Sequence, residues 1–138
     1  MNDDLKNMPD EYWKEKLTPE QYHVTREKGT EYPGTGVYLD NYEAGTYKCV
    51  GCGQELFQSD TKYESGSAWP AFWDVVDKNK VTTHRDMTFG MVRDSVECSR
   101  CGGHLGHVFP DGPRDKGGMR YCVSSVALKF DPKNVNDI

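Results

Sequence analysis

Four of the five cysteines in this 138-residue chain form two identical short motifs. The motifs read Cys49-Val-Gly-Cys52-Gly and Cys98-Ser-Arg-Cys101-Gly. A two-residue spacer lets both thiolates of a pair reach one tetrahedral ion, and the following glycine permits a tight turn after the second ligand. Because four thiolates leave no open coordination position, the doubled motif predicts a structural metal site that holds one Zn²⁺ per chain.

Other readings of the paired cysteines remain open from the residues alone. One C-x-x-C is also typical of a redox dithiol, although the thioredoxin type occurs in a βαβ context that this pattern does not suggest. Two disulfides are less favoured, because residues 1–17 are acidic and polar where a secretory signal is apolar, which predicts a cytoplasmic protein. An iron–sulfur cluster is a further group that four cysteines can hold.

The fifth cysteine, Cys122, lies in the segment Met119-Arg-Tyr-Cys-Val-Ser-Ser-Val-Ala-Leu-Lys-Phe130. If this segment is a strand, alternation places Arg120, Cys122 and Ser124 on one face. A guanidinium beside a thiol favours the thiolate, which is the nucleophilic form. A lone cysteine in a strand is more often a small core residue, so both readings stand at this level.

Two histidines and an aspartate follow the second cysteine motif. On a regular strand the rings of His104 and His107 face opposite ways, and both point inward only if Gly106 allows a bend. Each ring can instead be a hydrogen-bonded core residue, but their concentration with Asp111 in one glycine-rich segment favours a functional site. Upstream, Trp69 belongs to an aromatic loop that either packs in the core or forms a wall for a soft group such as a methyl thioether.

The elements that must position these residues are mostly short strands. One helix is predicted over residues 17–28, with Thr18 as N-cap, Gln21 as its capping-box partner and Gly29 as its stop. Residues 1–16 are expected to form a loosely ordered or surface-packed N-terminal arm. The predicted strands, separated by turn residues, indicate antiparallel sheets in one domain. They cover residues 36–39, 46–49, 55–57, 72–76, 80–83, 87–97, 104–109 and 119–130.

Composition argues against nucleic-acid binding and excludes a membrane-spanning helix. The formal net charge is −5, whereas nucleic-acid-binding proteins normally present a basic face. No run approaches the roughly 20 apolar residues that a membrane-spanning helix requires. We therefore expect neither a nucleic acid nor a membrane as a partner.

Taken together, the two C-x-x-C-G motifs and the segments SGSAWPAF, HLGHVFPDGP and RYCVSSVALKF resemble the methionine sulfoxide reductase B family, the peptide-methionine (R)-S-oxide reductases. The resemblance covers roughly residues 17–131, and it implies a single reductase domain over 17–138. It also implies a mainly β fold of two antiparallel sheets with N-terminal helical segments. For Cys49, Cys52, Cys98 and Cys101 it implies the zinc site of the metal-containing branch.

The same resemblance assigns roles to the remaining candidates. Cys122 matches the family's nucleophile, and His107 is the best assignment for the acid that protonates the sulfoxide oxygen. Trp69 matches the indole that packs on the substrate methyl group. The other matches are expected to bind substrate, with Ser124 at a position where the family usually has asparagine: His104, Asp111, Arg120 and Ser124.

These matches imply an oxidoreductase that repairs proteins after oxidative stress. It would reduce the R epimer of methionine sulfoxide in proteins through a cysteine sulfenic acid, with thioredoxin or another thiol as reductant, and we expect a monomer. The family's frequent second cysteine, in a G-C-G-W pattern, is Ser67 here, which predicts a cycle without an internal disulfide. The alternative is a non-catalytic zinc-ribbon-like interaction module, against which the net charge and the Cys122 segment argue.

Overall fold

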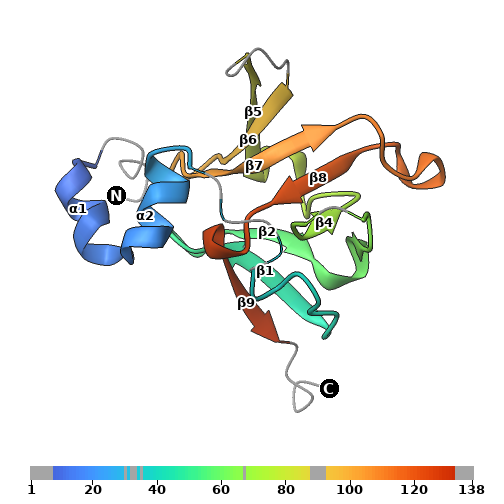
Figure 1. Cartoon of the computed structure of the whole chain (residues 1–138), viewed down its shortest axis with the longest axis horizontal. Coiled ribbons are helices and arrows are strands. Elements are labelled where there is room, and N and C mark those ends of the chain that lie inside the picture. Colours follow the sequence, from blue (N-terminus) through green and yellow to red (C-terminus); the bar gives the residue numbers. More distant parts are fainter. Residues whose placement is uncertain are drawn as a thin grey trace.

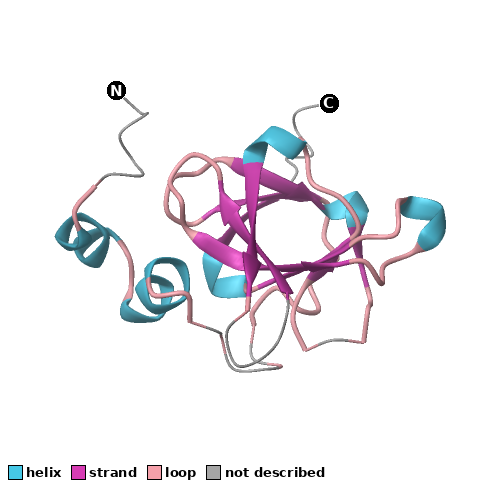
Figure 2. Cartoon of the chain, turned by 90° about the horizontal axis from the view of Figure 1, so that it is seen from above, coloured by secondary structure: helices cyan, strands magenta, loops and turns pink. Residues whose placement is uncertain are grey.

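The computed structural model describes residues 8–29, 31, 34, 36–66, 68–87 and 93–132. Ser67 and residues 88–92 of one predicted strand lie outside these ranges. In the described part, two helices lie at one end of the molecule beside two β-sheets (Figures 1 and 2). No helix in these ranges is long and apolar enough to cross a membrane.

The described strands form two antiparallel sheets, which confirms the predicted fold class. One sheet has the order β2-β1-β9, and the other has the order β3-β4-β8-β7-β6-β5. The bounds in the smaller sheet are β1 Gly45–Cys49, β2 Glu55–Gln58 and β9 Leu128–Pro132. Those in the larger sheet are β3 Lys62–Tyr63, β4 Ala71–Phe72, β5 Val81–Asp86, β6 Arg93–Cys98, β7 His104–Phe109 and β8 Arg120–Val123.

The predicted helix is confirmed as α2, Pro19–Arg26. The Thr18 hydroxyl accepts the Gln21 N–H, and the Gln21 side chain accepts the Thr18 N–H, which completes the capping box. The N-terminal arm is more ordered than we expected from the sequence, because α1 spans Asp10–Lys16. Its Trp13 is 1% exposed and packs against Gly51 of the first cysteine motif.

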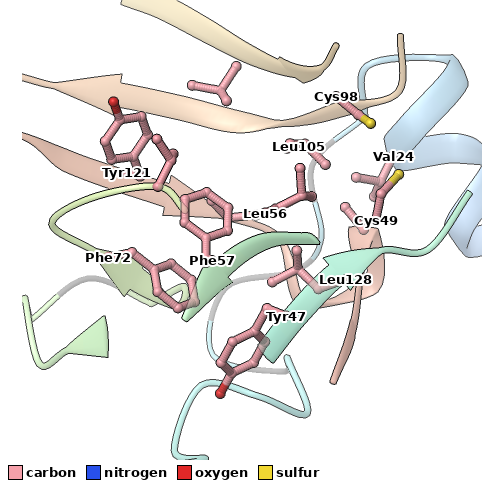
Figure 3. Packing of buried hydrophobic residues seen from close by; sticks show 14 of the residues in the cluster. Val24, Tyr47, Cys49, Leu56, Phe57, Phe72, Cys98, Leu105, Tyr121 and Leu128 are labelled. Atoms are coloured by element: carbon pink, nitrogen blue, oxygen red, sulfur yellow. The ribbon is translucent and has the colours of Figure 1, made fainter. Parts of the chain in front are cut away.

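Aromatic rings from both sheets meet in the core (Figure 3). Phe57 of the smaller sheet stacks on Phe72 of the larger one, with ring centroids 4.4 Å apart, and Tyr47 packs edge-on against Phe72. Burying each such ring stabilises the fold by about 2 kcal/mol. The same core continues through Leu56 and Leu105 to the paired cysteines, so the metal-binding motifs are part of it.

Three strand predictions are wrong. Of the predicted strand 72–76, only Phe72 lies in a strand, at the end of β4. Residues 36–39 form turns, in which the Leu39 N–H donates to the Gly36 carbonyl, and Val37 is 79% exposed and so has no buried face. The segment 119–130 is not one strand, because the 3₁₀ turn Ser125–Ala127 divides it into β8 and β9. The two halves belong to different sheets, and the turn carries the chain from one sheet to the other.

Candidate functional site

The paired cysteines converge at the ends of two hairpins. Cys49 ends β1 and Cys98 ends β6, while Cys52 and Cys101 lie in the turns that follow. The four Sγ atoms lie within 4.8 Å of one another, with Cys49–Cys101 at 3.6 Å and Cys52–Cys98 at 3.5 Å. Tetrahedral zinc with Zn–S bonds of about 2.3 Å places sulfurs about 3.8 Å apart. The spacing fits a metal and exceeds the disulfide bond length of about 2.05 Å.

The backbone holds each pair of cysteines in a nearly identical turn. Gly53 and Gly102, directly after the second cysteines, have φ of 80° and 77°, a left-handed conformation that glycine adopts without strain. Each glycine N–H donates to the carbonyl of the first cysteine of its motif, over 2.8 Å in both cases. The turn therefore fixes the two sulfurs of a pair before any ion binds, which is what a structural site requires.

Neighbouring side chains enclose this four-cysteine cluster. Cys49, Cys98 and Cys101 are at most 1% exposed, and the Gln54 amide lies 3.6 Å from the Cys98 sulfur. The Arg26 guanidinium donates to the Cys101 carbonyl over 2.9 Å and thereby attaches α2 to the cluster. The cluster joins the β1–β2 hairpin of one sheet to the β6–β7 hairpin of the other, so a bound ion would cross-link the two sheets.

The lone cysteine occupies a different place, on the face of the larger sheet that is turned away from the core. Cys122 lies directly opposite His107 in the β7–β8 ladder and opposite Ala71 in the β4–β8 ladder. Directly opposed residues share a face, so these three side chains point the same way. Their chain neighbours Tyr121 and Val108 point to the other face and are buried in the core.

A β-bulge brings both histidines to this face. Two successive residues of β6 pair with Gly106 and His104, which leaves Leu105 as the extra residue of β7. The rings of His104 and His107, three positions apart, are consequently 5.4 Å from each other. We expected the bend at Gly106, and it lies one residue earlier. Gly106 is needed for a different reason, since a Cβ there would lie 2.0 Å from the Cys122 carbonyl oxygen.

These residues surround a cavity of about 100 Å³. Five of the predicted catalytic and substrate-binding residues line it, together with Gly29, Arg93, Gly106 and Phe109. The five are Cys122, His107, His104, Trp69 and Ser124. A half-buried thiol, two imidazoles and an indole in one small cavity suit attack on a compact polar group that carries an apolar substituent. We call this cavity the Cys122 pocket.

The other two predicted residues line a neighbouring groove. The Arg120 guanidinium binds Asp111 at 2.8 and 3.2 Å, and it also lies 4.4 Å over the ring of Phe109, which lines the Cys122 pocket. The hydrogen bond from Arg120 lowers the pKa of Asp111. The same bond raises the pKa of Arg120, and negative charge on Cys122 acts in the same direction. Arg120 thus lies within electrostatic reach of Cys122, although it shares its charge with Asp111.

Glu31 is hydrogen-bonded to Trp69 of the pocket lining and to Val126. No sequence pattern indicated this role for Glu31. Its backbone carbonyl accepts the indole N–H of Trp69 at 3.1 Å, and its carboxylate accepts the Val126 N–H at 3.0 Å. Glu31 thereby ties the indole to the 3₁₀ turn that follows Ser124. Glu31 is 3% exposed, and this burial raises the pKa of its carboxyl group.

Arg93 is the second residue that the sequence did not single out. It is the first residue of β6, and its half-buried side chain lines the Cys122 pocket. We predicted a strand across this position, and alternation along that strand puts Arg93 on the same face as Ser95, which is paired with His107. Only the register between β6 and β7, which the sequence does not reveal, brings this guanidinium to the pocket.

Comparisons with known proteins agree with this arrangement. The SelR domain model matches residues 17–132. A peptide methionine sulfoxide reductase MsrB of Methanosarcina mazei is 57% identical over 121 residues, which cover 88% of this chain and 86% of the relative. The proteins of the same description from Leptospira interrogans and Agrobacterium fabrum are 55% and 52% identical, over 90% and 91% of this chain and 94% and 93% of their own lengths.

Among solved structures, a crystal structure of the Mis18 "Yippee-like" domain aligns with a TM-score of 0.48 and 22% identity. The alignment covers 67% of this chain and 99% of that one. The family model spans both cysteine motifs and every residue that lines the Cys122 pocket, and the curated relatives align with most of the chain. The chain therefore belongs to the SelR-domain family of peptide methionine sulfoxide reductases, MsrB.

Proposed function

We propose that this protein reduces the R epimer of methionine sulfoxide in peptides, with Cys122 as nucleophile and His107 as general acid. The observation that carries the proposal is the direct pairing of Cys122 with His107 on one face of the larger sheet, at a cavity that Trp69 also lines. A sulfoxide sulfur becomes electrophilic when its oxygen is protonated or strongly hydrogen-bonded. The pocket offers a thiol for the sulfur and imidazole donors for the oxygen.

In the proposed reaction the Cys122 thiolate attacks the sulfoxide sulfur while His107 delivers a proton to the oxygen. The S–O bond of the substrate breaks, methionine leaves, and Cys122 carries the oxygen as a sulfenic acid. Packing of the substrate methyl group on Trp69 selects the epimer whose oxygen points toward the histidines. His104, Arg93 and Ser124 supply further donors around that oxygen.

The four-cysteine cluster is proposed to hold zinc in a purely structural role. Four thiolate ligands saturate the ion, so it supplies folding free energy and has no position open for substrate. The residues that would hold it are Cys49, Cys52, Cys98 and Cys101. The Gln54 amide beside Cys98 and the Arg26–Cys101 hydrogen bond fix the orientation of the ligand turns.

Recycling is proposed to need an external thiol. The chain has five cysteines, and four belong to the cluster, which leaves Cys122 without a second thiol in its own pocket. One external thiol attacks the sulfenic acid to give a mixed disulfide and water, and a second thiol then releases the Cys122 thiol and an oxidised disulfide. Thioredoxin supplies both thiols in one molecule.

The test combines turnover with the mass of the oxidised enzyme. With dithiothreitol or thioredoxin, we expect reduction of R but not S dabsyl-methionine sulfoxide. One equivalent of the R substrate without reductant should add about 16 Da at Cys122 and leave the zinc bound. A mass loss of about 2 Da with zinc release would show that a cluster cysteine acts as resolving thiol. Turnover of the S epimer alone would contradict the proposed function.

A further inference from the structure

A second hollow adjoins the Cys122 pocket and has a much larger volume, about 540 Å³ against about 100 Å³. One wall is formed by residues 63–66, which begin at the last residue of β3, and the other by residues 111–113 after β7, with Arg120 also in the lining. We call it the flanking groove. The thiol and the imidazoles of the proposed reaction line the smaller Cys122 pocket, so the groove is not needed for the reacting group.

Two contacts connect the groove to the reacting thiol. Arg120 lies over Phe109, which lines the Cys122 pocket, and its other side binds Asp111 in the groove. Tyr63, in the opposite wall, pairs with Ala71, and Ala71 pairs with Cys122. The groove therefore begins two strands away from the nucleophile on the same face of the sheet. A peptide whose oxidised side chain enters the pocket has to leave over this surface or the one opposite to it.

The charge of the groove is set by one residue. Arg120 and Asp111 offset each other through their two hydrogen bonds, which leaves the Glu64 carboxylate. Glu64 accepts the Gly66 N–H at 3.1 Å, and no ion pair engages it within the part of the chain that the structure describes. The lining of the groove thus carries a formal charge of about −1 at neutral pH.

The two nearby lysines do not cancel this charge at the groove surface, and the exposed Arg114 and Asp115 that follow the wall residue Pro113 carry opposite charges. Lys62 interacts electrostatically with Glu64, but it is only 8% exposed. Its ammonium group donates a hydrogen bond to the Leu39 carbonyl and lies 3.8 Å from the centre of the Tyr42 ring. Lys116, beyond the opposite wall, lies over the Trp73 ring at 5.3 Å. Neither residue lines the groove.

We infer that the flanking groove binds the peptide segment next to the oxidised methionine and favours a segment that carries lysine or arginine. The inference rests on the proposed function, because it takes the Cys122 pocket as the sulfoxide site. Glu64 attracts the flanking cation, and the glycine-containing walls admit the peptide backbone. Since Glu64 is exposed to solvent, the preference is modest and depends on salt.

The experiment compares two peptides that differ only in residues within two positions of methionine-R-sulfoxide, lysine in one and glutamate in the other. At low salt, kcat/KM should favour the lysine peptide about two- to fivefold, and the ratio should shrink in 0.5 M salt, at a Debye length of about 4 Å. Glu64→Gln should bring the ratio close to one. Glu55→Gln, the same charge change at an exposed position of the smaller sheet, should leave the ratio as in the wild type.

Equal kcat/KM for both peptides in the wild type would overturn the inference, and so would a ratio that survives Glu64→Gln. In both cases the peptides would still be reduced, so the proposed function would stand. Failure to reduce either peptide would remove the proposed function and the inference with it.

Discussion

The four-cysteine cluster and the Cys122 pocket use the same residue type in opposite surroundings. Three cluster thiols are at most 1% exposed, and each pair is held by a tight turn that ends in a left-handed glycine. Cys122 is half-buried at a cavity wall, with an imidazole opposite and a guanidinium within electrostatic reach. The cluster joins the two sheets, whereas the pocket lies on the outer face of one of them.

The difference shows that the neighbours of a cysteine determine its role. Sulfurs that converge within 4.8 Å can share one ion and lose their freedom to react. A sulfur that meets a proton donor and an apolar wall can attack a substrate instead. Strand β7 connects the two sites, because it begins three residues after Cys101 and carries both histidines. A metal ion held by the cluster would therefore support the geometry of the pocket.

The largest expected effect comes from breaking the cluster. Cys49→Ser should leave the protein unfolded or aggregated, because binding of a structural zinc contributes on the order of 10 kcal/mol of folding free energy in small peptides. Thermal unfolding and zinc content of the purified variant check this. A chelator should likewise lower Tm before it lowers kcat of the protein that is still folded. A variant that melts like the wild type would contradict the structural role.

The same substitution at the other site should separate the two roles. Cys122→Ser should reduce kcat/KM by more than about a thousandfold, because a hydroxyl is a poor nucleophile toward sulfur. Its Tm and zinc content should match those of the wild type, since the half-buried side chain changes little in volume. Substantial remaining activity in steady-state assays would move the nucleophile elsewhere.

Next in size is the loss of the proposed acid. His107→Ala should lower kcat about a hundredfold with a smaller change in KM, because a general acid acts mainly in the transition state. His84→Ala provides the control, as this exposed histidine on β5 pairs with Glu97 and does not line the pocket. An effect confined to KM would assign His107 to substrate binding.

The smallest effect concerns the buried carboxyl behind the indole. Burial raises the pKa of Glu31 above its ordinary value of 4.5, so the folded state binds this proton more tightly than the unfolded state. The stability that follows is present at low pH and is lost as pH rises through the folded pKa. Glu31→Gln should therefore raise Tm by a few degrees at pH 7, and the gain should shrink toward pH 4.5.

Measurements of kcat/KM distinguish two effects of Glu31: the free-energy cost of burying its charge, and its contribution to the position of Trp69. Glu31→Gln keeps an acceptor for Val126 and leaves the backbone carbonyl that holds the Trp69 indole, so kcat/KM should stay within about twofold. Glu31→Ala removes the side-chain acceptor and should raise KM. If Glu31→Gln destabilises the protein more at pH 7 than at pH 5, the sign of the linkage is wrong.

Local sequence was sufficient for several elements of the fold. The capping box of Thr18 and Gln21 needs only residues of one helical turn, and the bounds of β7 follow from its flanking glycines and proline. The paired spacing of Cys49 with Cys52 and of Cys98 with Cys101 indicated the cluster, because a tight turn suffices to bring two sulfurs to one ion. The turns at residues 36–39 were mistaken for a strand because short β-prone runs do not reveal whether a partner strand exists.

The sequence by itself thus determined the chemistry available to this protein: four paired thiols for a metal, one lone thiol, and two histidines with an indole for a pocket. Only the tertiary structure decided how that chemistry is arranged. The bulge at Leu105 places His104 on the same face as His107. The register between β6 and β7 places Arg93 in the lining of the Cys122 pocket, whereas Arg120 and Asp111 line the flanking groove. The Glu31 carbonyl accepts a hydrogen bond from the indole of Trp69, 38 positions away in the sequence. These contacts depend on strand pairing between distant segments, and the free energy that selects one register comes from burying the whole core rather than from any local motif.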